Sequence, residues 1–259
     1  MNITDLIESQ SADFEREMAK VIKRLEKSID EIIMLLRMRD GQMIVSAANI
    51  NKAMSLSGQL EKALRESGYY ELAERSLKAN NKIMTAQHEG LKELLGRERL
   101  GQIDTTTLQA LQKMKFTGMS GLGDNALIGI REAIFNSVNL GLPVGILRDE
   151  ITKKLGGWGE YANTYIRTAK REFSQQVENN AAELIGFGEE KDDIWEYLPS
   201  ILQANSHKEC IFAVNKQYFT NEEKIQFESG GLYSHSEPRW NCVHSFRISN
   251  VTYEEAFGE

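Results

Sequence analysis

The side chains best suited to binding a metal ion occur in two short stretches near the end of this sequence. The first stretch, SHKECIF, contains His207 and Cys210, and the second, PRWNCVHSF, contains Cys242 and His244. Together they hold both cysteines and two of the four histidines of the 259-residue chain. Thiolate and imidazole are the usual ligands of zinc, and two converging pairs would make the closed four-ligand set of a structural zinc ion.

The spacing within each stretch suits such a site. His207 and Cys210 are three residues apart, which puts both side chains on one side of a helical turn. Cys242 and His244 are two residues apart and would share one face of a strand. The sequence therefore predicts a structural zinc cofactor on these four residues, with His235 as a substitute ligand. The alternative is two buried thiols and two solvated histidines without a metal.

The same stretch also allows a catalytic interpretation. The tripeptide His207–Glu209 fits the H-x-E pattern of zinc deaminases, whose glutamate transfers protons during attack by the metal-bound water. Those enzymes then need P-C-x-x-C, whereas this chain has PRWNCVH. Cys210 would also fill the position that a catalytic zinc leaves open for water. We therefore expect no enzymatic activity, with a zinc-dependent hydrolase that uses Glu209 as the alternative.

Apolar residues at helical spacing predict that residues 1–100 form a helical hairpin or bundle. Their steps of three and four residues make one apolar stripe along a first helix that ends near residues 39–41. Further helices are expected over about 43–65 and 71–95. The stripe consists of Phe14, Met18, Val21, Leu25, Ile29, Ile32 and Leu36. A second set widens it, so we expect a partner or a second copy to cover another side of this helix: Ile7, Ile22, Ile33 and Leu35.

Glycines predict breaks between the helices of a central region, residues 101–188. FTGMSGLGDN (116–125) is expected to be a loop, after which Asp124 caps a helix that ends at Gly141. Pro143 opens the next helix, which is expected to end at Gly156 and Gly157. A long helix should then begin near residue 160.

Residues 189–259 are expected to form a small α+β module, with a strand in DDIWEYLPS closed by Pro199. A unit of about 70 residues has a thin core and often depends on a metal. The expected fold is therefore mainly α, with an N-terminal helical hairpin or bundle and central helices. The C-terminal module is expected to be stapled by zinc.

Composition excludes several classes of protein. Hydrophobic residues make up 41% of the chain, which is typical of a globular protein. The net charge of −7 lies in residues 189–259, which hold 6 basic and 13 acidic residues. No basic nucleic-acid-binding patch is evident there. No apolar run approaches the roughly 20 residues that span a bilayer, so no membrane segment is expected. Two cysteines without an export signal indicate a reducing compartment.

The order of several residues after position 120 carries a family resemblance. The long helix contains RTAKREF and is followed by a strand with a tryptophan, the first Cys/His pair, the connector QYFTNEE and the second pair. The residues concerned are Arg167, Arg171, Glu172, Asn179, Asn180, Trp195, His207, Cys210, Pro238, Cys242 and His244. This order resembles the Mu F-like minor capsid family of tailed-bacteriophage head-morphogenesis proteins. That family has an R-T-E helix, an asparagine, a strand with tryptophan, C-x-x-C and a terminal H-P-x-C-x-C.

The resemblance implies a structural virion protein. Such a minor head protein is associated with the portal inside the capsid and assists head assembly, DNA packaging or DNA delivery. It would be found in the capsid interior near the portal, and in the host cytoplasm during assembly. Its expected partners are the portal or other head proteins, contacted through the N-terminal helices. Histidine replaces cysteine at two of the family's positions, which preserves metal-ligand character. The remaining alternative is a cellular helical scaffold with a metal knuckle.

Overall fold

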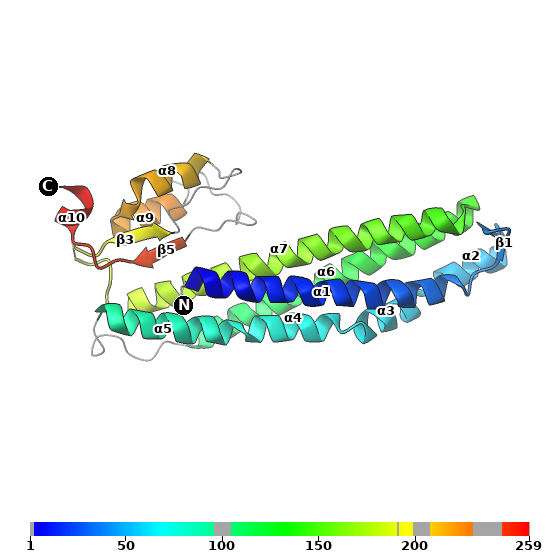
Figure 1. The fold of residues 1–259 in the computed structure, drawn as a ribbon, viewed down its shortest axis with the longest axis horizontal. Helices are drawn as coiled ribbons and strands as arrows, with labels where there is room; N and C mark the ends of the chain where they lie inside the picture. The colour runs from blue at the N-terminus through cyan, green and yellow to red at the C-terminus, as the bar shows by residue number, and fades with distance from the viewer. Residues whose placement is uncertain (1–2, 96–104, 191, 199–207, 230–244, 259) are drawn as a thin grey trace. The chain divides into compact units, whose positions relative to one another are not determined.

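The computed structural model describes residues 3–95, 105–190, 192–198, 208–229 and 245–258. The protein is mainly helical and has a small sheet near its C-terminus, as expected from the sequence (Figure 1). Contacts divide the chain into two compact units. Unit 1 comprises Met1–Ser9, Lys78–Lys113 and Arg167–Glu259, and unit 2 comprises Gln10–Leu77 and Met114–Ile166. The predicted division of the sequence into regions 1–100, 101–188 and 189–259 stays a prediction. Those regions follow the order of the sequence, whereas each compact unit combines segments that are separate along the chain.

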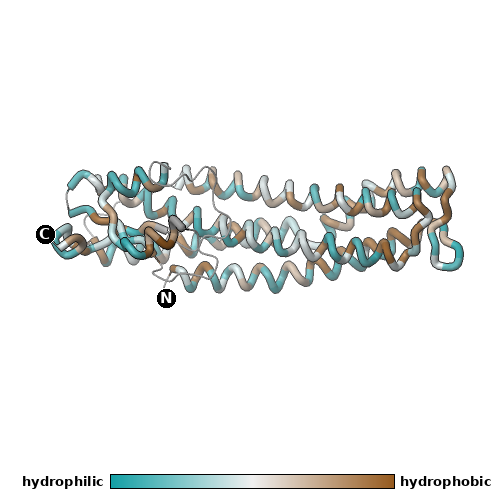
Figure 2. The backbone as a smooth tube through the Cα atoms, turned by 90° about the horizontal axis from the view of Figure 1, so that it is seen from above, coloured by the Kyte–Doolittle hydropathy of each residue, from teal (hydrophilic) through white to brown (hydrophobic). Residues whose placement is uncertain are grey.

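The first helix, α1 (Ile3–Ile33), confirms the predicted amphipathic stripe. All seven stripe positions are buried, six of them on α1 and Leu36 just beyond its end, and Leu25 has no exposed surface. Figure 2 shows apolar and polar residues alternating along the long helices, as the helical period requires. The periodicity of the sequence therefore located both this helix and its buried face.

The chain does not continue as a helix to residues 39–41 as predicted. It forms a hairpin of β1 (Met38–Arg39) and β2 (Gln42–Met43). Asp40 and Gly41 make the turn with φ angles of 49° and 76°. The type I′ turn of a two-residue hairpin needs positive φ at both central positions, and Asp-Gly is among the sequences that best provide it.

Short helices replace the two longer ones expected over 43–95. They are α2 (Ala47–Met54), α3 (Ser57–Glu66), α4 (Tyr69–Lys78) and α5 (Asn80–Leu95). Ser46 caps α2 by accepting a hydrogen bond from the backbone N–H of Asn49. Gly68, at φ 84°, adopts the left-handed conformation between α3 and α4.

Two long helices, α6 (Thr105–Leu140) and α7 (Val144–Leu184), run through the glycines that were expected to break them. The predicted loop at 116–125 and the predicted helix end at Gly156 and Gly157 are therefore wrong. At Gly123, packing explains why a glycine stands inside the helix. An added Cβ would lie 2.8 Å from a ring carbon of buried Tyr69 and 3.1 Å from Leu64. This glycine makes room for an aromatic ring, and tertiary packing outweighs its low helix propensity.

The C-terminal sheet has the strand order β4-β3-β5, with both pairings antiparallel. Its strands are β3 (Trp195–Leu198), β4 (Tyr218–Phe219) and β5 (Ser245–Ile248). The associated helices are α8 (Lys208–Lys216), α9 (Asn221–Glu228) and α10 (Tyr253–Phe257). The predicted strand at Trp195 is confirmed.

Aromatic rings fill the core of this C-terminal module. The Tyr197 and Phe246 rings are 4.9 Å apart, and those of Phe219 and Phe246 are 5.2 Å apart, in edge-to-face arrangements. Trp195 and Phe227 are buried in the same core. Large aromatic side chains bury much surface each, so the sheet has a substantial core, which it shares with Leu91 of α5 and with Ala181 and Ala182 of α7.

Candidate functional site

The structure does not support the predicted zinc. His207, Cys242 and His244 lie outside the described residues. Cys210 lies on α8 and is buried, and the Tyr197 hydroxyl donates a hydrogen bond to its Sγ at 3.8 Å. Across the described ranges, no group of three or more His, Cys, Asp or Glu side chains could hold a metal ion. The prediction of a zinc cofactor is therefore wrong, and Cys210 instead packs as a small buried side chain beside the aromatic core.

Glu209, the proposed proton carrier of the deaminase alternative, lies in the first turn of α8. Its side chain is not among those described. That alternative needed the same metal ligands as the structural zinc, so nothing in the described part of the chain supports it. The expectation that the protein is not an enzyme stays a prediction.

The two arginines that carried the family resemblance share one carboxylate. Arg171 Nη2 lies 2.6 Å from Glu8 Oε1, and Arg167 Nε lies 3.5 Å from Glu8 Oε2. Arg171 is 12% exposed and Glu8 is 43% exposed, so this contact is only partly shielded from solvent. The ion pairs join the start of α1 to α7 within unit 1, which is a structural role.

A buried carboxylate that sequence reasoning missed lies further along α7. Glu178 Oε1 accepts a hydrogen bond from the backbone N–H of Ile248 at 2.9 Å. Its Oε2 accepts from Gln87 Nε2 at 3.0 Å and from Arg247 Nη1 at 3.2 Å. The side chain of Glu178 is 4% exposed. One signal was present in the sequence, because Glu178 stands three and four residues before Ala181 and Ala182, at the spacing that places side chains on one face of a helix.

Side chains of α7 cover one edge of the sheet. Gln175 Oε1 accepts a hydrogen bond from the backbone N–H of Phe246 at 2.9 Å. Phe246 stands two residues before Ile248, whose N–H bonds to Glu178. The other edge of β5 pairs with β3. An uncovered edge strand invites pairing with other chains, so Gln175 and Glu178 both position β5 and protect it.

Lys170, on the same helix, is fully buried. Its Nζ donates a hydrogen bond to Asn80 Oδ1 at 3.3 Å. Burial lowers the pKa of this amine from 10.5 to about 8. A lysine with a lowered pKa is a common feature of catalytic sites, but this one has no exposed surface through which a substrate could reach it.

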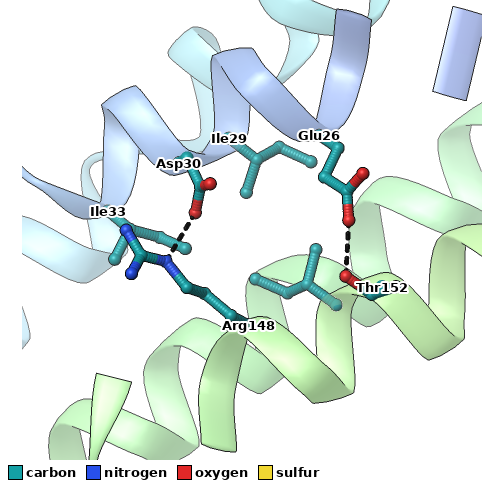
Figure 3. Close-up of a pocket in the computed structure, with 7 residues that line it drawn as sticks. Glu26, Ile29, Asp30, Ile33, Arg148 and Thr152 are labelled. Atoms are coloured by element: carbon teal, nitrogen blue, oxygen red, sulfur yellow. Dashed lines mark hydrogen bonds and ion pairs between the residues drawn. The ribbon is translucent and has the colours of Figure 1, made fainter. Parts of the chain in front are cut away.

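A small groove in unit 2 lies between α1 and α7 (Figure 3). Arg148 Nε donates to Asp30 Oδ1 at 2.9 Å, and the Thr152 hydroxyl donates to Glu26. The cavity is about 150 Å³, below the roughly 300 Å³ at which pockets for small molecules begin. The groove is therefore best understood as a polar contact that aligns two helices.

Exposed apolar side chains occur at the end of unit 2 where α6 and α7 meet. Backbone hydrogen bonds join this turn to the β1–β2 hairpin, from Met43 N to Leu142 O at 3.1 Å and from Val144 N to Gly41 O at 2.9 Å. We call the exposed residues around this junction the apolar tip, and they are between 49% and 66% exposed: Met34, Leu35, Val45, Leu140 and Ile146. Exposed apolar side chains gathered at one end of a fold are candidates for a surface that binds other proteins.

Comparisons with protein-family models, with curated proteins and with solved structures found no match to this chain. Within the described residues, none of the helices combines the length and the apolar content that crossing a membrane requires.

Proposed function

We propose that the protein is a structural component of a tailed-bacteriophage head, a minor head protein that docks on the portal or a neighbouring head protein. It would assist head assembly and DNA packaging or delivery from the capsid interior. The phage assignment rests on the order of residues from Arg167 to His244 in the sequence. The assembly role rests on one structural observation, the apolar tip.

The tip replaces the docking surface expected from the sequence. The apolar side chains that widen the α1 stripe were expected to face a partner, but Ile7 and Ile33 are buried within the chain itself. Ile22 is half-buried, and only Leu35 of that set is exposed. The length of α1 therefore offers a partner little apolar surface, whereas Met34 and Leu35, directly after its last residue, contribute to the tip.

Burial of the tip would favour association. Removing apolar surface from water contributes roughly 25 cal/mol per Å². Backbone hydrogen bonds between the hairpin and the α6–α7 turn fix the backbone beside Val45, Leu140 and Ile146. Little backbone conformational entropy would therefore be lost when a partner covers them.

The test is a pair of double variants with matched exposure. Met34→Asp with Leu140→Asp alters the tip, at residues 61% and 66% exposed. Met114→Asp with Ile225→Asp alters residues 58% and 55% exposed on α6 and α9. Quantitative mass spectrometry of purified virions should find the tip variant at least roughly tenfold depleted and the control at wild-type level.

Two results would count against this proposal. Equal incorporation of both variants would remove the tip as the docking site. A gene neighbourhood without portal and capsid genes, together with a tip variant that only loses self-association by light scattering, would favour a cellular helical scaffold.

A further inference from the structure

A groove of about 610 Å³ lies in unit 1, at the C-terminal end of α7. One part of its lining is apolar and includes Leu95, Leu184, Ile185, Phe187 and Val251. Leu184 is 47% exposed, so this wall is open to solvent. The volume falls in the range of roughly 300–1,000 Å³ that is usual for ligand pockets.

The other part of the lining is acidic. It contains Glu189, Glu190, Asp192 and Asp193. Asp193 Oδ2 accepts hydrogen bonds from the backbone N–H groups of Gly188 at 2.7 Å and Glu190 at 2.9 Å. Asp192 Oδ1 accepts from Tyr253 N at 3.0 Å. These bonds use one oxygen of each aspartate and hold both carboxylates in the wall.

The described basic side chains of this module are paired elsewhere. Lys216 pairs with Glu223, Lys224 with Glu228 at 2.8 Å, and Arg247 with Glu178 at 3.2 Å. Among the residues that the structure describes, no lysine or arginine forms an ion pair with the four groove carboxylates; Lys191, between Glu190 and Asp192 in the sequence, is not described. The groove therefore has negative charge that these three cations do not neutralise.

A metal ion does not suit this arrangement. The described carboxylates do not come together in a group of three or more that could hold one. Carboxylates spread along an apolar wall suit cations carried on a carbon stem, because the stem can lie against leucine and phenylalanine while the charge meets the acids. We propose that the groove binds a basic, partly apolar segment of a partner protein, in which lysine or arginine stands next to leucine-like residues. This inference does not depend on the phage-head assignment.

The test uses the full chain and a fluorescein-labelled peptide, GLRKLRG, with fluorescence anisotropy at low ionic strength. Two further peptides separate charge from apolar contact: GLQQLQG keeps the leucines, and GSRKSRG keeps the charges. We expect GLRKLRG to bind more tightly than either, and added salt to weaken its binding.

Matched variants locate the binding site. Glu189→Gln with Glu190→Gln should weaken GLRKLRG binding roughly fivefold, as should Leu184→Ser. Glu132→Gln with Glu222→Gln makes the same change in net charge at exposed positions outside the groove lining, and should leave the affinity within about twofold of wild type. Circular dichroism checks that each variant is folded.

Three outcomes would overturn the proposal. Equal weakening by both glutamine double variants would mean that only overall charge matters. Equal binding of GLRKLRG and GSRKSRG would remove the apolar wall from the site. Stoichiometric binding of Ca²⁺ alone, measured by calorimetry and lost in the Glu189→Gln, Glu190→Gln variant, would make the groove a metal site instead.

Discussion

The carboxylate of Glu178 accepts a hydrogen bond at 2.9 Å from the backbone of Ile248, which lies 70 residues further along the chain. The same carboxylate binds the Arg247 guanidinium. One buried side chain of α7 therefore fixes the position of β5 through a backbone bond and an ion pair. This contact is the main polar link between the helix and the sheet that we find in the described part of unit 1.

Removing this carboxylate should destabilise the protein strongly. Glu178→Ala leaves the N–H of Ile248 without its partner and, among the described residues, Arg247 with only its hydrogen bond to the Ser174 hydroxyl, and breaking a buried ion pair costs roughly 3–5 kcal/mol. Urea denaturation should show this loss in the free energy of unfolding. Glu183→Ala, at an exposed position of the same helix, is the control and should change it by less than about 0.5 kcal/mol. Similar midpoints for the two variants would show that the Glu178 network contributes little.

Two glycines of α6 should respond in opposite directions to alanine. Gly121→Ala places its Cβ in open space and should stabilise the helix by roughly 0.5–1 kcal/mol. Gly123→Ala places its Cβ 2.8 Å from the Tyr69 ring, and should cost roughly 1–3 kcal/mol through overpacking. Thermal melting of both variants checks the sign. If the two substitutions had the same effect, the packing explanation for the continuous helix would fail.

Lys170 should make stability rise with pH over an alkaline window. Its pKa is about 8 in the folded protein and 10.5 when exposed, so between these values the unfolded state binds a proton that the folded state does not. The free energy of unfolding should therefore increase from pH 8 towards 10.5, by roughly 3 kcal/mol if the full shift is expressed. Below pH 8 the burial penalty is present in full.

The corresponding experiment compares wild type with Lys170→Met by urea denaturation from pH 7 to 9.5. The upper limit avoids the ionisation of Tyr69, whose burial raises its pKa and which in the unfolded chain titrates near pH 10. The variant should lack the rise, whereas Lys153→Met, at an exposed site, should retain it. Parallel pH profiles for wild type and Lys170→Met would contradict the lowered pKa.

The effect of replacing Gly41 in the β1–β2 turn should come from backbone conformation alone. Gly41 has φ 76° and open space around its missing Cβ, so Gly41→Ala meets strain without a steric clash. We expect a loss of roughly 1–2 kcal/mol in the free energy of unfolding. Gly145→Ala, also in open space but at an ordinary φ on α7, should cause no loss. A neutral Gly41→Ala would mean that the hairpin contributes little to stability.

Local patterns in the sequence determined several elements of this protein. The spacing of Phe14, Met18 and Val21 identified α1 and its buried face, because the helical period is a property of neighbouring residues. The strand at Trp195 was also correctly predicted. The Asp40–Gly41 turn was locally encoded too, although it was interpreted as a helix end, since the same dipeptide serves both purposes.

Only the tertiary structure decided which surfaces meet. Tyr69, from a distant segment, occupies the space beside Gly123. The helix can continue there because glycine has no side chain that would clash with the ring. Ile7 and Ile33 are covered by the chain itself, whereas the sequence could not distinguish this from a partner. Cys210 lies beside Tyr197, and Glu178 is buried against β5, because folding brings together residues that are separate in the sequence. A helix or turn depends on contacts between near neighbours, whereas the environment of a side chain depends on residues that only folding brings to it.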